Sequence, residues 1–157
     1  MFGAVEQDAG TISRQGPYDI AVVLTGPRKT FVTRQKGRLV GLFVNREART
    51  YVDVPSFYSI ATTRPLADIA VEALLKRFQL GLPNILLPES VIGGVEVLAG
   101  HENFRDAFLR LKQRAGVYRE DIGRVEFMTD RVYRVNMAIP ANVPVGDYVV
   151  DVYLFRD

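Results

Sequence analysis

The residues of this sequence that are best suited to chemistry are one histidine and three close pairs of carboxylates. The pairs are Glu120 with Asp121, Asp68 with Glu72, and Glu102 with Asp106. Paired carboxylates of this kind usually lie on solvated helix surfaces. His101 is expected at a helix start, where the helix dipole disfavours its protonation, and no Gly-x-Ser-x-Gly elbow accompanies it. A zinc site would need carboxylates for every other ligand. We therefore expect no catalytic residue, no metal site and no cofactor, and we interpret the chain as a non-enzyme.

Five bases, without an acid among them, form the most distinctive charged segment. They are Arg28, Lys29, Arg34, Lys36 and Arg38. If this segment forms an outward hairpin, it presents a positive patch that could meet anionic lipid headgroups, an acidic partner or a small anion. The alternative is that these bases protect an edge strand from aggregation.

A second candidate surface is aromatic. Tyr51, Phe57 and Tyr58 surround Pro55 and could form an exposed ledge for a ligand or a partner. The alternative is core packing, which we favour for Phe57.

Composition limits the class of protein. The chain has no cysteine, which excludes thiolate catalysis and cysteine-ligated clusters. Its 20 bases and 18 acids nearly balance, which disfavours a nucleic-acid partner. No stretch approaches the roughly 20 consecutive apolar residues of a membrane helix, so we expect the chain as given to be soluble.

Two β-rich blocks flank a helical segment, and together they must position these candidates. Extended patterns cover residues 2–5, 18–24, 31–36, 39–45 and 50–62, and they resume at 124–128 and continue to the end. From Tyr18 to Leu24, apolar residues occupy both odd-numbered and even-numbered positions, which predicts a strand that is covered on both faces. Helical spacing begins at Thr63, which could cap a helix in two pieces ending at Gly81, and a second helix is expected from Asn103 to Gly116.

The last 25 residues favour a sandwich. Tyr133 to Ile139 and Tyr148 to Leu154 alternate as strands do, and Gly146-Asp147-Tyr148 after Pro144 has the form of a tyrosine corner. We predict one mainly β domain over 1–157, an immunoglobulin-like β-sandwich with a two-helix insertion at about 63–116. The alternative is an α+β fold with helices on one face of an antiparallel sheet. Both ends look cut from a longer protein, with a further strand expected beyond Asp157.

The chain also resembles a family of transmembrane proteins of alphaproteobacteria. The segments that carry this resemblance are 2–5, 18–20 with 26–27, 44–45, 55–58, 63–66, 111–114 with 118–121, and 140–157. The resemblance implies a signal sequence, a periplasmic domain and a C-terminal membrane helix, with genes often beside sulfite/sulfonate exporter-type permeases. It supplies no catalytic residues.

On these grounds we expect an accessory or interaction module at the periplasmic face of the inner membrane. Its partner would be an inner-membrane protein, with no nucleic acid involved. The alternative is a domain that binds a small anion or another small ligand in support of transport.

Overall fold

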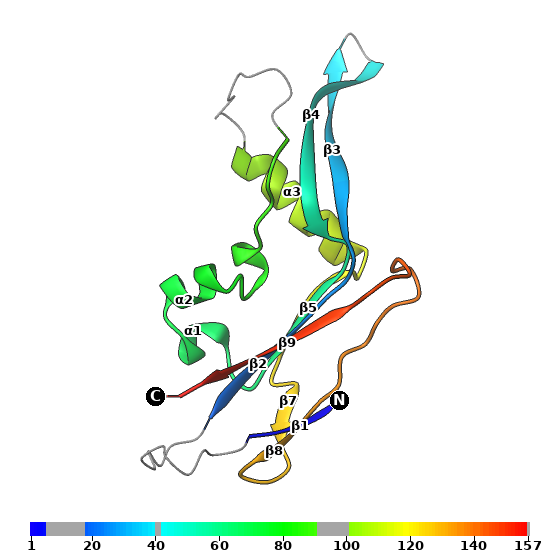
Figure 1. The fold of residues 1–157 in the computed structure, drawn as a ribbon. Helices are drawn as coiled ribbons and strands as arrows, with labels where there is room; N and C mark the ends of the chain where they lie inside the picture. Colours follow the sequence, from blue (N-terminus) through cyan, green and yellow to red (C-terminus); the bar gives the residue numbers. More distant parts are fainter. Residues whose placement is uncertain (6–17, 40–41, 91–100, 157) are drawn as a thin grey trace.

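The protein is mainly β, as predicted, and the strands of its described residues form three separate sheets (Figure 1). The computed structural model describes residues 1–5, 18–39, 42–90 and 101–156, with the backbone alone described for 35–39, 42–47 and 101. In chain order the elements are β1 (Phe2–Ala4), β2 (Asp19–Thr25), β3 (Arg28–Leu39), β4 (Leu42–Pro55), β5 (Tyr58–Thr62), α1 (Leu66–Ile69), α2 (Glu72–Arg77), the 3-10 helix η1 (Leu82–Asn84), α3 (His101–Arg114), β6 (Tyr118–Ile122), β7 (Val125–Phe127), β8 (Val132–Val135) and β9 (Val149–Phe155).

The central sheet has the strand order β6-β5-β2-β9. Strand β2 pairs antiparallel with both of its neighbours, whereas β6 runs parallel to β5. Every residue from Ile20 to Leu24 is at most 6% exposed. The prediction that this strand is covered on both faces is therefore confirmed.

A three-stranded sheet, β1-β8-β7, covers one face of the central sheet. Ile20, Val22 and Ala61 of the central sheet share one buried cluster with Val125, Tyr133 and Val135 of the smaller sheet. Two sheets packed in this way are compatible with the predicted sandwich. Strand β8 ends at Val135, four residues before the predicted end at Ile139. Strands β8 and β9 lie in different sheets and do not pair with each other.

Helices cover the opposite face of the central sheet. Val23 and Ile60 pack there in a second buried cluster with Leu75 of α2, Phe108 of α3 and Tyr118 of β6. The protein thus combines features of both expected architectures: a second sheet lies on one face, and helices lie on the other.

The first predicted helix is in two pieces, α1 and α2, as expected. Thr63 does not cap it, because its hydroxyl donates to Asp19 Oδ1 at 2.7 Å and accepts from the Ile20 amide at 3.2 Å. Helix α3 begins two residues before Asn103 and ends, as predicted, just before Gly116, whose φ is +71°.

The predicted tyrosine corner is present before β9. The Tyr148 hydroxyl donates to the Pro144 carbonyl at 2.7 Å, and the Tyr148 ring lies 6.0 Å from the Phe57 ring. Gly146 has φ +154°, and a Cβ at this position would come within 2.5 Å of Pro27 Cγ. The corner therefore joins the end of the chain to the turn that precedes β3.

Candidate interaction site

Strands β3 and β4 form a long hairpin, the arm, which spans residues 28–55. Their pairing runs from Arg28 with Pro55 to Leu39 with Leu42, and the two strands form a sheet of their own. Figure 1 shows the arm projecting from the rest of the molecule beside α3. The strand breaks differ from the predicted ones: β4 continues through residues 46–49, and the chain leaves it only at Ser56 and Phe57.

The arm concentrates positive charge. Of the 20 bases and 18 acids in the chain, residues 28–55 contain seven bases and two acids, which leaves 13 bases and 16 acids elsewhere. A basic arm therefore extends from a body that is slightly acidic. Such a separation of charge favours encounter with an acidic surface.

The predicted bases differ in their surroundings. The Arg28 guanidinium donates to the Asp53 carbonyl at 2.5 Å and lies 3.3 Å from Asp53 Oδ2, while Lys29 and Arg34 are exposed. The backbone places Lys36 and Arg38 further along the arm, and their side chains lie outside the described part of the structure. The arm thus brings all five positions onto one projecting strand.

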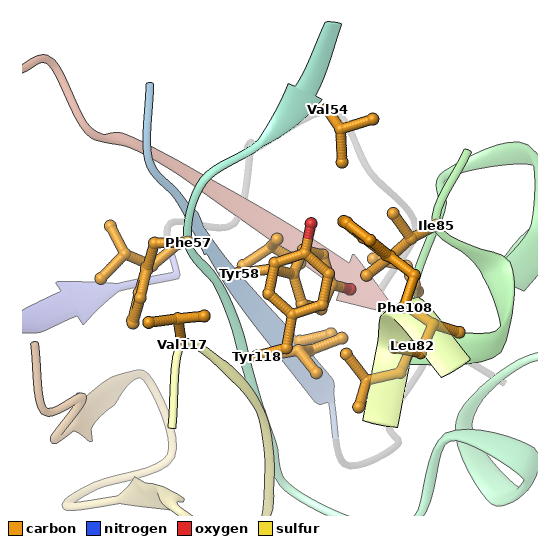
Figure 2. Close-up of a cluster of buried hydrophobic side chains, with 14 of the residues drawn as sticks. Val54, Phe57, Tyr58, Leu82, Ile85, Phe108, Val117 and Tyr118 are labelled. Carbon is orange, nitrogen blue, oxygen red and sulfur yellow. The ribbon is translucent and has the colours of Figure 1, made fainter. Parts of the chain in front are cut away.

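Aromatic rings attach the base of the arm to α3. Phe31 of β3 and Tyr51 of β4 lie 5.7 and 5.1 Å from the Phe108 ring, between ring centroids. The Phe108 ring in turn lies 6.1 Å from that of Tyr118, and Figure 2 shows these two side chains among Leu82, Ile85 and their other buried neighbours. Such ring pairs add about 0.5–1.5 kcal/mol each beyond the burial of their area. The base of the arm is therefore part of the core.

One lysine lies against the rings of Phe31, Phe108 and Tyr118, which are here called the aromatic seat. Lys112 Nζ lies 3.3 Å from the centroid of Phe31, 5.3 Å from that of Phe108 and 5.8 Å from that of Tyr118. Burial lowers the pKa of Lys112 to about 8. The ring faces offset part of the cost of burying the ammonium group. Lys112 thereby links α3 to β3 by a contact that is both apolar and electrostatic.

The other strand of the arm is held by residues 88–90. The Val52 amide donates to the Pro88 carbonyl, and the Ser90 amide donates to the Thr50 carbonyl, both at 2.8 Å. Arg49 and Glu89 form an ion pair at 3.4 Å in which both side chains are less than 20% exposed. With both strands anchored, the arm has a fixed base from which its outer half can reach a partner.

A groove of about 880 Å³ lies beside the arm and along α3. Three arginines line it: Arg34 from the arm, and Arg105 and Arg110 from the helix. The Arg105 guanidinium is also bonded to the carbonyls of Pro83 and Ile85, at 2.7 and 2.8 Å. Nothing local in the sequence predicted this groove, because residues about 70 positions apart form it.

The prediction of an exposed aromatic ledge around Pro55 is wrong. Tyr51, Phe57 and Tyr58 are 1%, 0% and 3% exposed, so core packing holds for all three. The Tyr58 hydroxyl donates to the Gln79 carbonyl and accepts from the Gly81 amide, each at 3.0 Å. Burial raises the pKa of Tyr58, and these bonds leave its hydroxyl no role at the surface.

The carboxylates of the three predicted pairs lie in different surroundings. Glu120 accepts from the Leu82 amide at 2.6 Å, whereas Asp121 pairs with Arg119 at 3.3 Å. Glu72 pairs with Lys76 instead of Asp68. Glu102 and Asp106 are exposed on α3, and the side chain of His101 lies outside the described part. No group of three or more metal-ligating side chains occurs among the residues that the structure describes.

Comparison with known proteins places the chain in a family. A family model described as "Putative transmembrane protein" (Alph_Pro_TM) matches residues 1–157. No curated protein and no solved structure gives a significant match. Within the described ranges, no helix has the length and hydrophobicity needed to cross a membrane. The match over the whole sequence shows that the chain belongs to this family of transmembrane proteins, which is alphaproteobacterial by name.

Proposed function

We propose that the chain is a non-enzymatic, periplasmic interaction domain of a membrane protein, and that the arm binds an acidic surface of an inner-membrane partner. The arm carries this proposal, because a basic hairpin projects from a slightly acidic body as a two-stranded sheet of its own, which residues 88–90 hold at its base in the described structure. Membership of a transmembrane family supports the location of the partner. A sulfite/sulfonate exporter-type permease is the first partner to test, because the family resemblance described above implies one.

Charge reversal on the arm tests this function. Lys29→Glu combined with Arg34→Glu changes two exposed side chains of β3. We expect this variant, expressed from its own gene, to recover the membrane partner at least about tenfold less well, and we expect the wild-type interaction to weaken as salt rises.

The matched control reverses the same amount of charge outside the arm. Arg124→Glu combined with Arg131→Glu changes two exposed bases of the body. Its recovery of the partner should equal that of the wild type. If both variants recover the partner equally poorly, the loss comes from the change in net charge and not from the arm. If neither variant recovers less of the partner, the proposed role of the arm is contradicted.

A second candidate function is the binding of a small anion, and the groove favours it. Arg34, Arg105 and Arg110 line a groove large enough for a sulfonate or a similar organic anion, and they outnumber its two carboxylates, Asp106 and Glu120. Sulfite, sulfate and a sulfonate would each be titrated while the thermal unfolding midpoint is followed. Saturable stabilisation that grows as RT ln(1 + [L]/Kd) and is lost in Arg110→Gln would favour ligand binding, whereas an unchanged midpoint would favour the interaction domain.

A further inference from the structure

The two edges of the central sheet are protected very differently. Strand β6, at one edge, carries Arg119, Glu120 and Asp121 within its five residues. Strand β9, at the other edge, has the sequence Val-Val-Asp-Val-Tyr-Leu-Phe and contains one charged residue, Asp151. Charged side chains prevent edge strands from pairing with other chains. Edge β6 has this protection, and edge β9 lacks it.

A row of apolar side chains on β9 is also uncovered. Val150, Val152 and Leu154 lie opposite Leu24, Val22 and Ile20 of strand β2. Ile20 and Val22 are fully buried, whereas the three β9 residues are 43%, 46% and 47% exposed. The small sheet that covers β2 therefore stops short of β9, and in the described part of the chain no strand pairs with the outer edge of β9.

We propose that β9 is a self-association site, at which it pairs antiparallel with β9 of a second copy about a two-fold axis through Val152. In this register Val150 faces Leu154 of the second copy, so the uncovered apolar rows become continuous. On the opposite face Asp151 lies against Tyr153 of the second copy, so the two aspartates are not directly opposed. The strand is thus complementary to itself, as a two-fold interface requires.

This pairing would join the two central sheets into one. The main-chain donors and acceptors on the outer edge of β9 would be satisfied across the axis, and each half-exposed valine or leucine would gain an apolar neighbour. The arm takes no part in this contact, so the inference stands independently of the proposed function.

The first test measures the molar mass of the 157-residue chain by sedimentation equilibrium, over about 1 to 200 µM, because dimer formation depends on protomer concentration. We expect a reversible dimer. Val152→Lys should raise its dissociation constant at least about tenfold, because it places two ammonium groups directly opposite each other. The matched control is Val32→Lys on β3, where the valine is 53% exposed, and this variant should dimerise like the wild type.

The second test fixes the register and does not depend on the folding of the lysine variant. The chain has no cysteine, so Val152→Cys introduces a single thiol. Directly opposed residues of antiparallel strands have Cα atoms about 4.5–5.5 Å apart, which suits a disulfide. Mild oxidation should therefore cross-link Val152→Cys into dimers and leave Val32→Cys largely monomeric.

Two outcomes would overturn the inference. The first is a chain that stays monomeric over the whole concentration range, as it would if a further strand of the protein or a strand of another protein covered β9. The second is a dimer that Val152→Lys leaves intact, because the contact would then lie elsewhere.

Discussion

Strand β2 and the arm are both extended β structure, yet they differ in almost every physical respect. In β2 five consecutive residues are at most 6% exposed, and a sheet and a group of helices cover its two faces. The arm forms a two-stranded sheet of its own, which residues 88–90 hold at its base, and it carries seven bases against two acids. The folding free energy is therefore expected to depend on β2 and its neighbours, while the charge available to a partner is concentrated on the arm.

The buried core ends and the exposed, charged part of the arm begins at the base of the arm. Phe31 and Tyr51 pack on Phe108 of α3, and Thr33 is still buried, whereas Val32 and Arg34 are exposed. Substitutions at the base should affect stability, and substitutions further out should affect binding alone. The following predictions test this division, from the largest expected effect to the smallest.

Truncation in the centre should have the largest effect. Ile20 is fully buried between the two sheets, so Ile20→Ala should lower the free energy of unfolding by about 2–5 kcal/mol. Val32→Ala on the arm, where the valine is 53% exposed, should change it by less than about 0.5 kcal/mol. Urea denaturation followed by circular dichroism measures both. Similar losses in the two variants would remove the distinction between centre and arm.

Loss of the tyrosine corner should have an intermediate effect. Tyr148→Phe keeps the ring against Phe57 and removes the hydrogen bond to the Pro144 carbonyl, so we expect a loss of about 1 kcal/mol. Tyr153→Phe is the control, because the Tyr153 hydroxyl has no hydrogen bond to another described residue. If both variants unfold at the wild-type urea midpoint, the corner contributes nothing to stability.

Lys112 is only partly buried, so solvent screening weakens the effect of its pKa on stability, and we expect this pH dependence to be the smallest effect. It reports on the seat of the arm. Burial lowers the pKa of Lys112 from 10.5 to about 8. Between these values the unfolded chain holds a proton that the folded chain has released, so stability should rise with pH above about 8. From about pH 10 the raised pKa values of Tyr58 and Tyr118 act in the opposite direction.

Lys112→Met should abolish the rise between pH 8 and 10, because the thioether fills the same space without a charge. Lys29→Met removes an exposed amine of the arm and should retain the rise. Urea unfolding midpoints measured at several pH values test this prediction. If the midpoint of Lys112→Met still rises between pH 8 and 10, a group other than Lys112 causes the rise.

The sequence predicted those features whose signals are local. Apolar residues at both odd-numbered and even-numbered positions of 20–24 predicted a strand that is buried on both faces. The residues around Gly146 and Tyr148 predicted the tyrosine corner. Gly116 marked the end of α3 because its positive φ suits glycine. In each case the signal lies in residues close together in the sequence.

Features that depend on distant contacts were missed. Tyr51 and Tyr58 are amphipathic side chains that suit a surface or a core, and their burial depends on α3 and on residues 79–82, which no local pattern connects to them. The assignment of β8 and β9 to different sheets likewise depends on β1 and β2. The groove combines Arg34 with residues of α3 and η1, so its existence could follow only from the fold.

Shortening the arm tests the central claim most directly. Arg34 and Ala48 face each other across the hairpin, so an Asn-Gly turn can replace residues 35–47 and keep the aromatic seat. We predict that the shortened protein retains its free energy of unfolding within about 0.5 kcal/mol and recovers the proposed membrane partner at least about tenfold less well. Undiminished recovery of the partner by a stably folded, shortened protein would contradict the account.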